Sequence, residues 1–150
     1  MKKGLLFTIM ICLASISLFA QQTDNKKKEQ FENFKVEREE FISKAMKLTA
    51  DEKKEFWPLC NELHLKKFEL NKPLREEIRK IHKARKANQP VSEADYKKVI
   101  ELAVEVKKKE AQLEQEYTEK FLKVIPAEKV FLYQGAERQF GKETMKKRGR

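Results

Sequence analysis

The chain has 150 residues, of which 34 are Lys or Arg and 24 are Asp or Glu, so its formal net charge is +10. It contains only four Gly, four Pro and two Cys, and 39% of its residues are charged. So few turn residues disfavour a many-stranded sandwich or barrel, and two cysteines exclude a disulfide-rich mini-fold and a four-cysteine zinc site. The composition predicts an elongated, basic, all-α protein.

The first twenty residues have the pattern of a secretory signal peptide. Lys2 and Lys3 give a short cationic start, and an uncharged stretch runs from Leu5 to Ala20. An uncleaved membrane anchor is the alternative, for which this stretch is short. We therefore predict export to the periplasm, with a helical domain over residues 21–140 and no later membrane span. Loss of the two lysines lowers the net charge from +10 to +8. An exported chain is not expected to have nucleic acid as its partner.

The first helix is predicted from Asp24 to Met46. Its apolar residues recur at spacings of three, four or seven, which is typical of one helix face against a core. These residues are Phe31, Phe34, Phe41, Ala45 and Leu48. Arg38 fills the place that this spacing skips.

A second, long helix is predicted from about Ala50 to Ala87. Thr49 and Glu52 have the spacing of a capping box, in which each side chain bonds the backbone N–H of the other residue. Pro58 and Pro73 each remove a backbone donor and predict bends. One face carries Phe56, Leu59, Leu63, Leu70, Leu74, Ile78 and Ile81, while Trp57, Leu65 and Phe68 lie off it.

Two further helices complete the predicted fold. After the turn at residues 88–90, Ser92 caps a third helix that extends to Val124, and Pro126 begins a fourth that ends near Phe140. The basic residues 141–150 are expected to form a frayed, flexible tail. The two central helices must form a long antiparallel hairpin, flanked by the first and fourth helices. Because the hairpin cannot shield its own apolar faces, we expect a symmetric homodimer.

The start of the second helix is repeated once. The segments at residues 48–53 and 124–129 both begin with an apolar pair and end in Glu-Lys. This repeat, on an exported basic helical chain, resembles the Spy/CpxP family of periplasmic proteins, whose LTxxQ motifs lie near helix starts. Leu48, Thr49 and Glu52 match the first motif, with Glu in place of Gln, and Glu128 matches the second. Residues 56–59 and 136–140 resemble the divergent branch of the family common in Bacteroidetes. The resemblance implies a hairpin fold and a cradle-shaped dimer.

The residues offer little support for catalysis. Cys60 and His64 lie four residues apart on one helical face, which is the spacing of a nucleophile and its base, or of two metal ligands. No spacing assigns a third group, and we predict that the chain is not an enzyme and needs no cofactor. His82 lies five turns further along that face, and zinc is the candidate ion if a metal binds, since some members of the resembled family respond to zinc or nickel. The alternative, which we favour, is a buried Cys60 and two solvated histidines.

Client binding is the leading functional hypothesis. An ATP-independent chaperone needs scattered apolar side chains in a charged field, because charge attracts an unfolded protein and apolar contact holds it loosely. The predicted client-binding surface consists of Trp57, Leu65, Phe68, Arg75, Arg79 and Lys83. The alternative is a regulatory module that docks on a sensor protein and reports envelope stress. A trimeric, Skp-like holdase ranks lower because its core needs strands, which this sequence does not predict.

Overall fold

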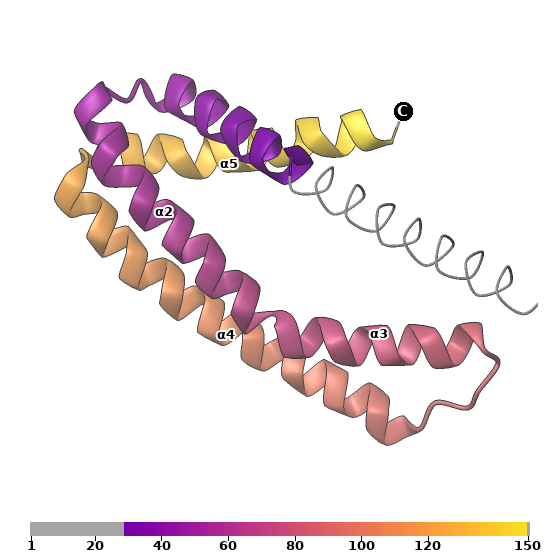
Figure 1. The fold of residues 1–150 in the computed structure, drawn as a ribbon. Helices are drawn as coiled ribbons and strands as arrows, with labels where there is room; N and C mark the ends of the chain where they lie inside the picture. Colours follow the sequence, from indigo (N-terminus) through magenta and orange to yellow (C-terminus); the bar gives the residue numbers. More distant parts are fainter. Residues whose placement is uncertain (1–28, 150) are drawn as a thin grey trace, which may run out of the picture.

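The computed structural model describes residues 29–149, and this part of the chain contains helices and no strand. A helix over residues 29–46, called the N-terminal helix below, precedes the labelled elements in Figure 1. These are α2 (Ala50–Leu70), α3 (Lys72–Lys86), α4 (Glu93–Val124) and α5 (Ala127–Arg148). The all-α prediction is thus confirmed. The predicted signal peptide lies outside the described residues, and within them no helix is both long enough and apolar enough to cross a membrane.

The predicted hairpin is present. Helices α2 and α3 run in one direction, and α4 returns antiparallel beside both of them (Figure 1). Near one end, the rings of Phe56 and Phe121 lie 4.9 Å apart between their centroids. Nearer the turn, the Lys98 ammonium lies 3.0 Å from a Glu77 carboxylate oxygen. Partner numbers fall on α4 as residue numbers rise along α2 and α3, as antiparallel pairing requires.

Capping boxes begin both arms of the hairpin, as the sequence indicates. The Thr49 hydroxyl accepts the backbone N–H of Glu52 at 3.3 Å, and the Glu52 carboxylate accepts the N–H of Thr49 at 2.7 Å. Ser92 and Asp95 make the same reciprocal pair at the start of α4. Each box satisfies two backbone donors that no helical carbonyl can reach. At α5 the N-cap residue is Pro126, whose side chain makes no capping hydrogen bond.

The second predicted helix is divided at Asn71. Helix α2 continues through Pro58 and ends at Leu70, whereas Pro73 lies in the first turn of α3. The exposed position of Pro58 lets water satisfy the backbone carbonyl that loses its partner there. At the break, the Asn71 side chain donates to the carbonyl of Lys67 at 2.9 Å. A helix start tolerates proline because its first N–H groups have no helical acceptor.

The predicted end of the last helix is wrong. We expected α5 to stop near Phe140 and a frayed tail to follow, but α5 continues to Arg148. Its added turns are supported by contacts that a sequence pattern does not reveal. The Lys147 ammonium pairs with Glu37 on the N-terminal helix, and the Thr144 hydroxyl donates to the Phe140 carbonyl at 2.9 Å. The ring of Phe140 also packs against Phe34, 5.3 Å away between centroids.

A cluster of buried side chains lies where the N-terminal helix, α2, α4 and α5 meet. Phe56 is at its centre, with aromatic rings of Trp57, Phe121 and Tyr133 within 5.2 Å of its own centroid. Tilted and edge-on ring pairs of this kind add to the stabilisation from burial. The cluster also contains Ile42, Met46, Leu48, Cys60, Leu63, Tyr117, Ile125, Val130 and Ala136.

The buried face of the N-terminal helix differs from the predicted one. Phe31, placed first in the predicted stripe, is 64% exposed. The buried positions are instead Arg38, Ile42 and Met46, four residues apart, with Ser43 beside them. The helix is thus turned so that its buried face includes a charged residue. Apolar periodicity alone predicts the neighbouring face, since that one carries more aromatic residues.

We expect the Phe56→Ala variant to lose about 3 to 5 kcal/mol of unfolding free energy, because truncation leaves a cavity among three aromatic rings. Phe131→Ala is the matched control, since Phe131 is 75% exposed, and should change the unfolding free energy by less than about 0.5 kcal/mol. Urea denaturation followed by circular dichroism measures both. Equal losses in the two variants would contradict the assigned core.

Candidate functional site

Cys60 and His64 lie one turn apart on α2, at the edge of the core. Cys60 is fully buried, as predicted, while the His64 side chain is 44% exposed. Helix α5 contributes Tyr133, whose hydroxyl lies 3.1 Å from the Cys60 sulfur and 3.4 Å from Nε2 of His64. The thiol and the imidazole therefore share a hydrogen-bonding partner on the facing helix.

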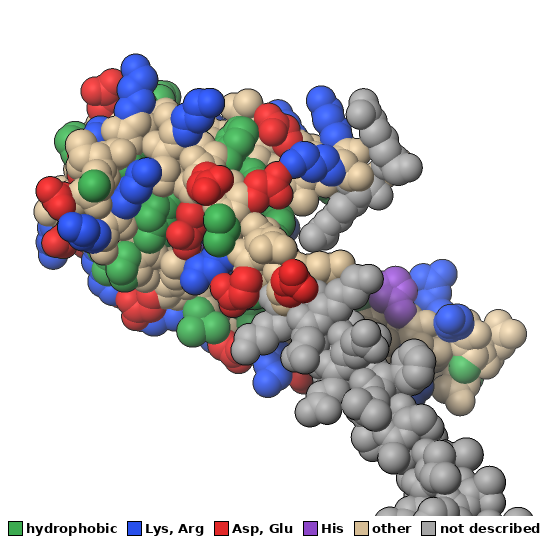
Figure 2. Space-filling model, turned by 45° about the horizontal axis from the view of Figure 1, so that its top comes forward, with side chains coloured by type: hydrophobic (Ala, Val, Ile, Leu, Met, Phe, Trp, Pro, Cys, Tyr) green, Lys and Arg blue, Asp and Glu red, His purple; other side chains and the backbone are tan. Residues whose placement is uncertain are grey.

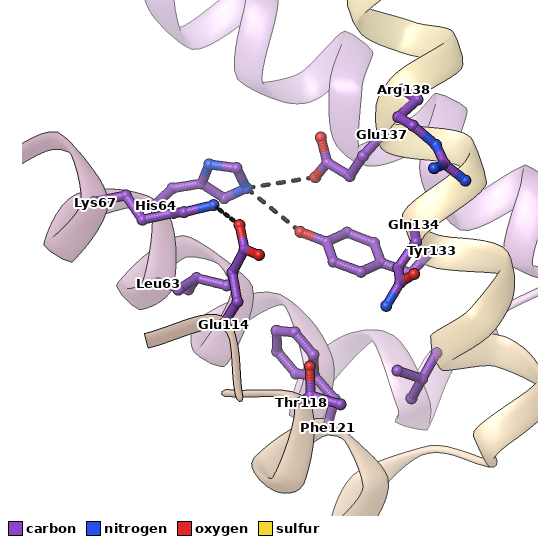
Figure 3. A pocket seen from close by; sticks show the side chains of 11 residues that line it. Leu63, His64, Lys67, Glu114, Thr118, Phe121, Tyr133, Gln134, Glu137 and Arg138 are labelled. Atoms are coloured by element: carbon purple, nitrogen blue, oxygen red, sulfur yellow. Dashed lines mark hydrogen bonds and ion pairs between the residues drawn. The ribbon is translucent and has the colours of Figure 1, made fainter. Parts of the chain in front are cut away.

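Glu137, one turn beyond Tyr133 on α5, brings a carboxylate to the same place. Its Oε1 atom lies 3.4 Å from Nε2 of His64. The possible ligand atoms of Cys60, His64 and Glu137 all lie within 4.8 Å of one another. Figure 3 shows His64 on one side and Glu137 and Tyr133 on the other, with their polar ends pointing toward each other. A thiol, an imidazole and a carboxylate thus converge from two helices.

Arg38, from the N-terminal helix, lies at the point where these groups meet. Its guanidinium Nη2 contacts both the Glu137 carboxylate and His64, and lies 3.4 Å from the Cys60 sulfur. Its Nε also donates a hydrogen bond to the Glu137 carboxylate, at 3.4 Å. The guanidinium carbon also lies 5.6 Å from the centre of the Trp57 ring. Arg38 is only 8% exposed, so Glu137 supplies the counter-charge that a buried cation needs.

The protonation states follow from this arrangement. Burial raises the pKa of Glu137, but hydrogen bonds from His64 and Arg38 outweigh burial and hold that pKa at about 2. Burial likewise lowers the pKa of Arg38, but the Glu137 partner leaves the pKa above its ordinary value. Burial and the nearby Cys60 and Glu137 raise the pKa of Tyr133, so its hydroxyl stays neutral. The site therefore holds a charged Arg38–Glu137 pair at neutral pH.

Three groups contact Nε2 of His64, namely Arg38, Glu137 and the Tyr133 hydroxyl. In its neutral form Nε2 accepts a hydrogen bond from Arg38, and in its charged form it donates toward Glu137. Burial lowers the pKa of His64, but hydrogen bonds to Cys60 and Glu137 outweigh both burial and repulsion from Arg38. The pKa of His64 is therefore above its ordinary value. Protonation of His64 therefore exchanges the hydrogen bond from Arg38 for one to Glu137.

A cavity of about 410 Å³ opens beside this cluster. Its apolar part is formed by the core residues Leu63, Phe121 and Val130. An ion pair between Lys67 of α2 and Glu114 of α4 spans one side of it (Figure 3). The remaining lining residues are His64, Thr118, Tyr133, Gln134, Glu137 and Arg138. Three members of the cluster therefore line a space that a small ion or molecule can enter.

His82, the third metal candidate from the sequence, is not part of this cluster. It lies on α3, beyond the break at Asn71, and is exposed to solvent. The structure thus brings together Cys60 and His64 of the three candidates and adds Glu137 to them.

Trp57 does not belong to the predicted client-binding surface. It is buried in the core, where its indole Nε1 donates to the Ser43 hydroxyl at 3.0 Å. The sequence pattern left Trp57 off the apolar face of α2 because it treated that face as narrow. The N-terminal helix and α4 contact α2 from two sides, so both Phe56 and Trp57 are buried.

The other predicted client-binding residues lie on the surface. Leu65 and Phe68 of α2 are 61% and 56% exposed. The Arg75 guanidinium lies over the Phe68 ring at 4.1 Å and donates to the Phe68 carbonyl at 2.9 Å. Arg79 and Lys83 are exposed on α3. This pairing of an aromatic ring with a cation leaves much of the ring available to a partner.

The two repeated segments meet in space. The Lys129 ammonium, from the second copy, lies 2.5 Å from the Glu52 carboxylate of the first and 3.0 Å from the Lys47 carbonyl. Leu48 of the first copy is buried, whereas Glu128 of the second is exposed in the first turn of α5. The repeat therefore joins the start of α2 to the start of α5.

Sequence reasoning missed Arg38, Tyr133 and Glu137 as members of the site. One signal was present, since Arg38 interrupts the apolar spacing of its helix at a position that proves buried. Glu137 follows a buried Ala136 but looks like any surface acid in a charged helix. Its contact with Arg38 joins residues 99 positions apart, which no local pattern encodes.

Comparison of the chain with protein-family models, with curated proteins and with solved structures gives no match. The resemblance to the Spy/CpxP family therefore stays a prediction from the motifs.

We expect the stability difference between the wild type and Glu137→Gln to shrink in acid. The pKa of Glu137 is about 2 in the fold and 4.5 ordinarily, so its contribution is complete above pH 4.5 and is lost as the pH falls toward 2. That contribution is up to about 3 kcal/mol. Urea unfolding at a series of pH values measures the difference.

Glu128→Gln is the matched control for this pH series, because Glu128 lies on the same helix and is exposed. Its stability should follow the wild type at every pH. A constant difference between the wild type and Glu137→Gln from pH 7 to pH 2 would contradict the ion pair with Arg38.

Proposed function

We propose that the protein is an ATP-independent, chaperone-like protein of the periplasm that binds partly unfolded proteins along the distal part of its hairpin. One observation carries this proposal: no residue from His64 to Glu105 is buried. We call this stretch the arm; it comprises the end of α2, all of α3 and the first part of α4. Its apolar side chains remain in partial contact with water and are available to a client.

The arm is strongly basic along α3. This helix has seven basic residues and only two acidic ones. Lys72, Arg75, Arg79, Lys83 and Lys86 recur every three or four residues, so they follow one side of the helix. A continuous row of positive charge attracts acidic, unfolded segments from a distance and accelerates their first encounter.

Apolar side chains accompany this row of charge. Leu65 and Phe68 are exposed at the α2 end of the arm, and Ile100 and Val104 are 63% and 50% exposed on α4. Ile100 and Val104 are one helical turn apart and therefore share a face. Figure 2 shows chiefly the opposite end of the molecule, where hydrophobic, basic and acidic side chains are interspersed. Along the arm, Leu65 and Phe68 are likewise separated by charged residues in the sequence. Small, separated apolar contacts suit weak binding to many sequences.

The dimer expected from the sequence belongs to the same proposal. Leu74 and Ile81 are only half-buried against α4, and Ile78 is 36% exposed. A second copy would shield this side of the arm and leave the basic row free.

If the dimer forms, light scattering of the purified protein should give a mass of two chains.

We expect the purified protein, without ATP, to suppress aggregation of a thermally unfolding acidic client at several-fold molar excess. Added salt should weaken the suppression, because the first encounter depends on charge. Turbidity of the client solution measures the effect. Phe68→Ala and the double variant Arg79→Gln, Lys83→Gln should each reduce suppression severalfold.

Phe131→Ala and Lys142→Gln are the matched controls, since both side chains are exposed on α5, outside the arm. They should suppress aggregation as well as the wild type does. No suppression by the wild type would refute the proposal. Capture of one dedicated partner without any suppression would favour the regulatory alternative.

A further inference from the structure

We propose that Cys60, His64 and Glu137 form a binding site for a divalent cation of the zinc class, which enters by displacing the Arg38 guanidinium. The three donors come from two packed helices, and their ligand atoms lie within 4.8 Å of one another. Thiolate sulfur, imidazole nitrogen and carboxylate oxygen are the three kinds of protein ligand that Zn²⁺ accepts. Of these donors only His64, the first residue of the arm, belongs to the arm; Cys60 and Glu137 lie outside it.

The donors already converge on a positive charge. Nη2 of Arg38 contacts the Glu137 carboxylate and His64 Nε2 and lies 3.4 Å from the Cys60 sulfur. One atom thus occupies the position where a cation would meet all three donors. The metal would take this position, and the Cys60 sulfur, 3.4 Å from Nη2, would move about 1 Å inward to reach a Zn–S distance of about 2.3 Å.

The exchange conserves the charge of the cluster. Before it, the guanidinium carries +1 and the carboxylate −1, with the cysteine counted as S–H and the imidazole in the neutral form that ligates a metal. Afterwards the ion carries +2, the carboxylate −1 and the thiolate −1, while Arg38 has left. Zn²⁺ binds the sulfur as the S–H proton is released to solvent, and no electron is transferred. The core therefore gains no net charge when the ion replaces Arg38.

An access route and an open coordination position are present. His64, Tyr133 and Glu137 line the cavity of about 410 Å³ as well as the cluster, so an ion can arrive from this side with bound water. Three protein ligands and one water are the usual set of an open zinc site. The Tyr133 hydroxyl, 3.1 Å from the Cys60 sulfur, can hydrogen-bond the coordinated thiolate.

Displacement makes Arg38 a competitor of the metal. The ion must break the Arg38–Glu137 pair, so the intact arginine lowers the affinity. Replacing it with a neutral residue of similar size removes this competition. Arg38→Gln should therefore bind the metal at least about tenfold more tightly than the wild type, although it removes a residue that contacts all three donors.

Titration with Co²⁺ alone tests the site, because a thiolate bound to Co²⁺ gives a charge-transfer band in the near ultraviolet. The wild type should develop this band with release of a proton, and Zn²⁺ should abolish it. Cys60→Ser should lose the band. His64→Gln and Glu137→Gln should weaken binding at least about tenfold.

His82→Gln is the matched control, since His82 is a solvent-exposed histidine on α3, and its Co²⁺ affinity should equal that of the wild type. Circular dichroism verifies that each variant is folded, and His64→Gln keeps the test decisive if Cys60→Ser unfolds, because the His64 ring is partly exposed. The absence of the band in the wild type at about millimolar Co²⁺ would refute the site. So would a band that Glu137→Gln leaves unchanged, or weaker binding in Arg38→Gln.

Discussion

The buried charge of Arg38 constrains the end of the hairpin where the N-terminal helix, α2, α4 and α5 meet. A guanidinium removed from water is stable only where its N–H groups find acceptors, and Arg38 finds them on α2 and α5. The N-terminal helix can therefore dock in one rotation and at one depth, with Ile42 and Met46 directed into the core. The same contact fixes where Glu137 lies relative to α2. One ion pair thus links the N-terminal helix to α5 and holds together the polar cluster beside the core.

The sequence was sufficient for features that depend on neighbouring residues. Capping at Thr49 and Ser92, the antiparallel hairpin and the burial of Cys60 were predicted and are confirmed. On α4, Tyr117 and Phe121 lie one helical turn apart and are both buried, as the helical period allows for one face. Local hydrogen bonds and helical periodicity are short-range properties, which a single sequence contains in full.

Features that depend on contacts between distant helices were not predictable in this way. The length of α5 depends on Lys147 meeting Glu37, and the burial of Trp57 depends on packing from two sides. Arg38 lies in the predicted stripe and is buried, but the buried face extends from it to Ile42 and Met46 rather than to Phe31. Apolar spacing cannot anticipate this shift, because the partner of the buried charge is 99 residues away. The predicted metal ligands were incomplete for the same reason, since spacing along α2 cannot point to a carboxylate on α5.

The stretch without buried residues also determines how the molecule opens. Amide protons in the arm are protected by helical hydrogen bonds and by surface ion pairs such as that of Lys98 with Glu77, with little apolar burial to be undone. Such segments exchange with solvent through local opening, whereas amides near Phe56 and Tyr117 exchange only when the whole fold unfolds. The same pair of helices therefore contains an arm that opens locally and a core that opens only on global unfolding. The arm can open and re-form many times while the buried cluster around Phe56 stays folded.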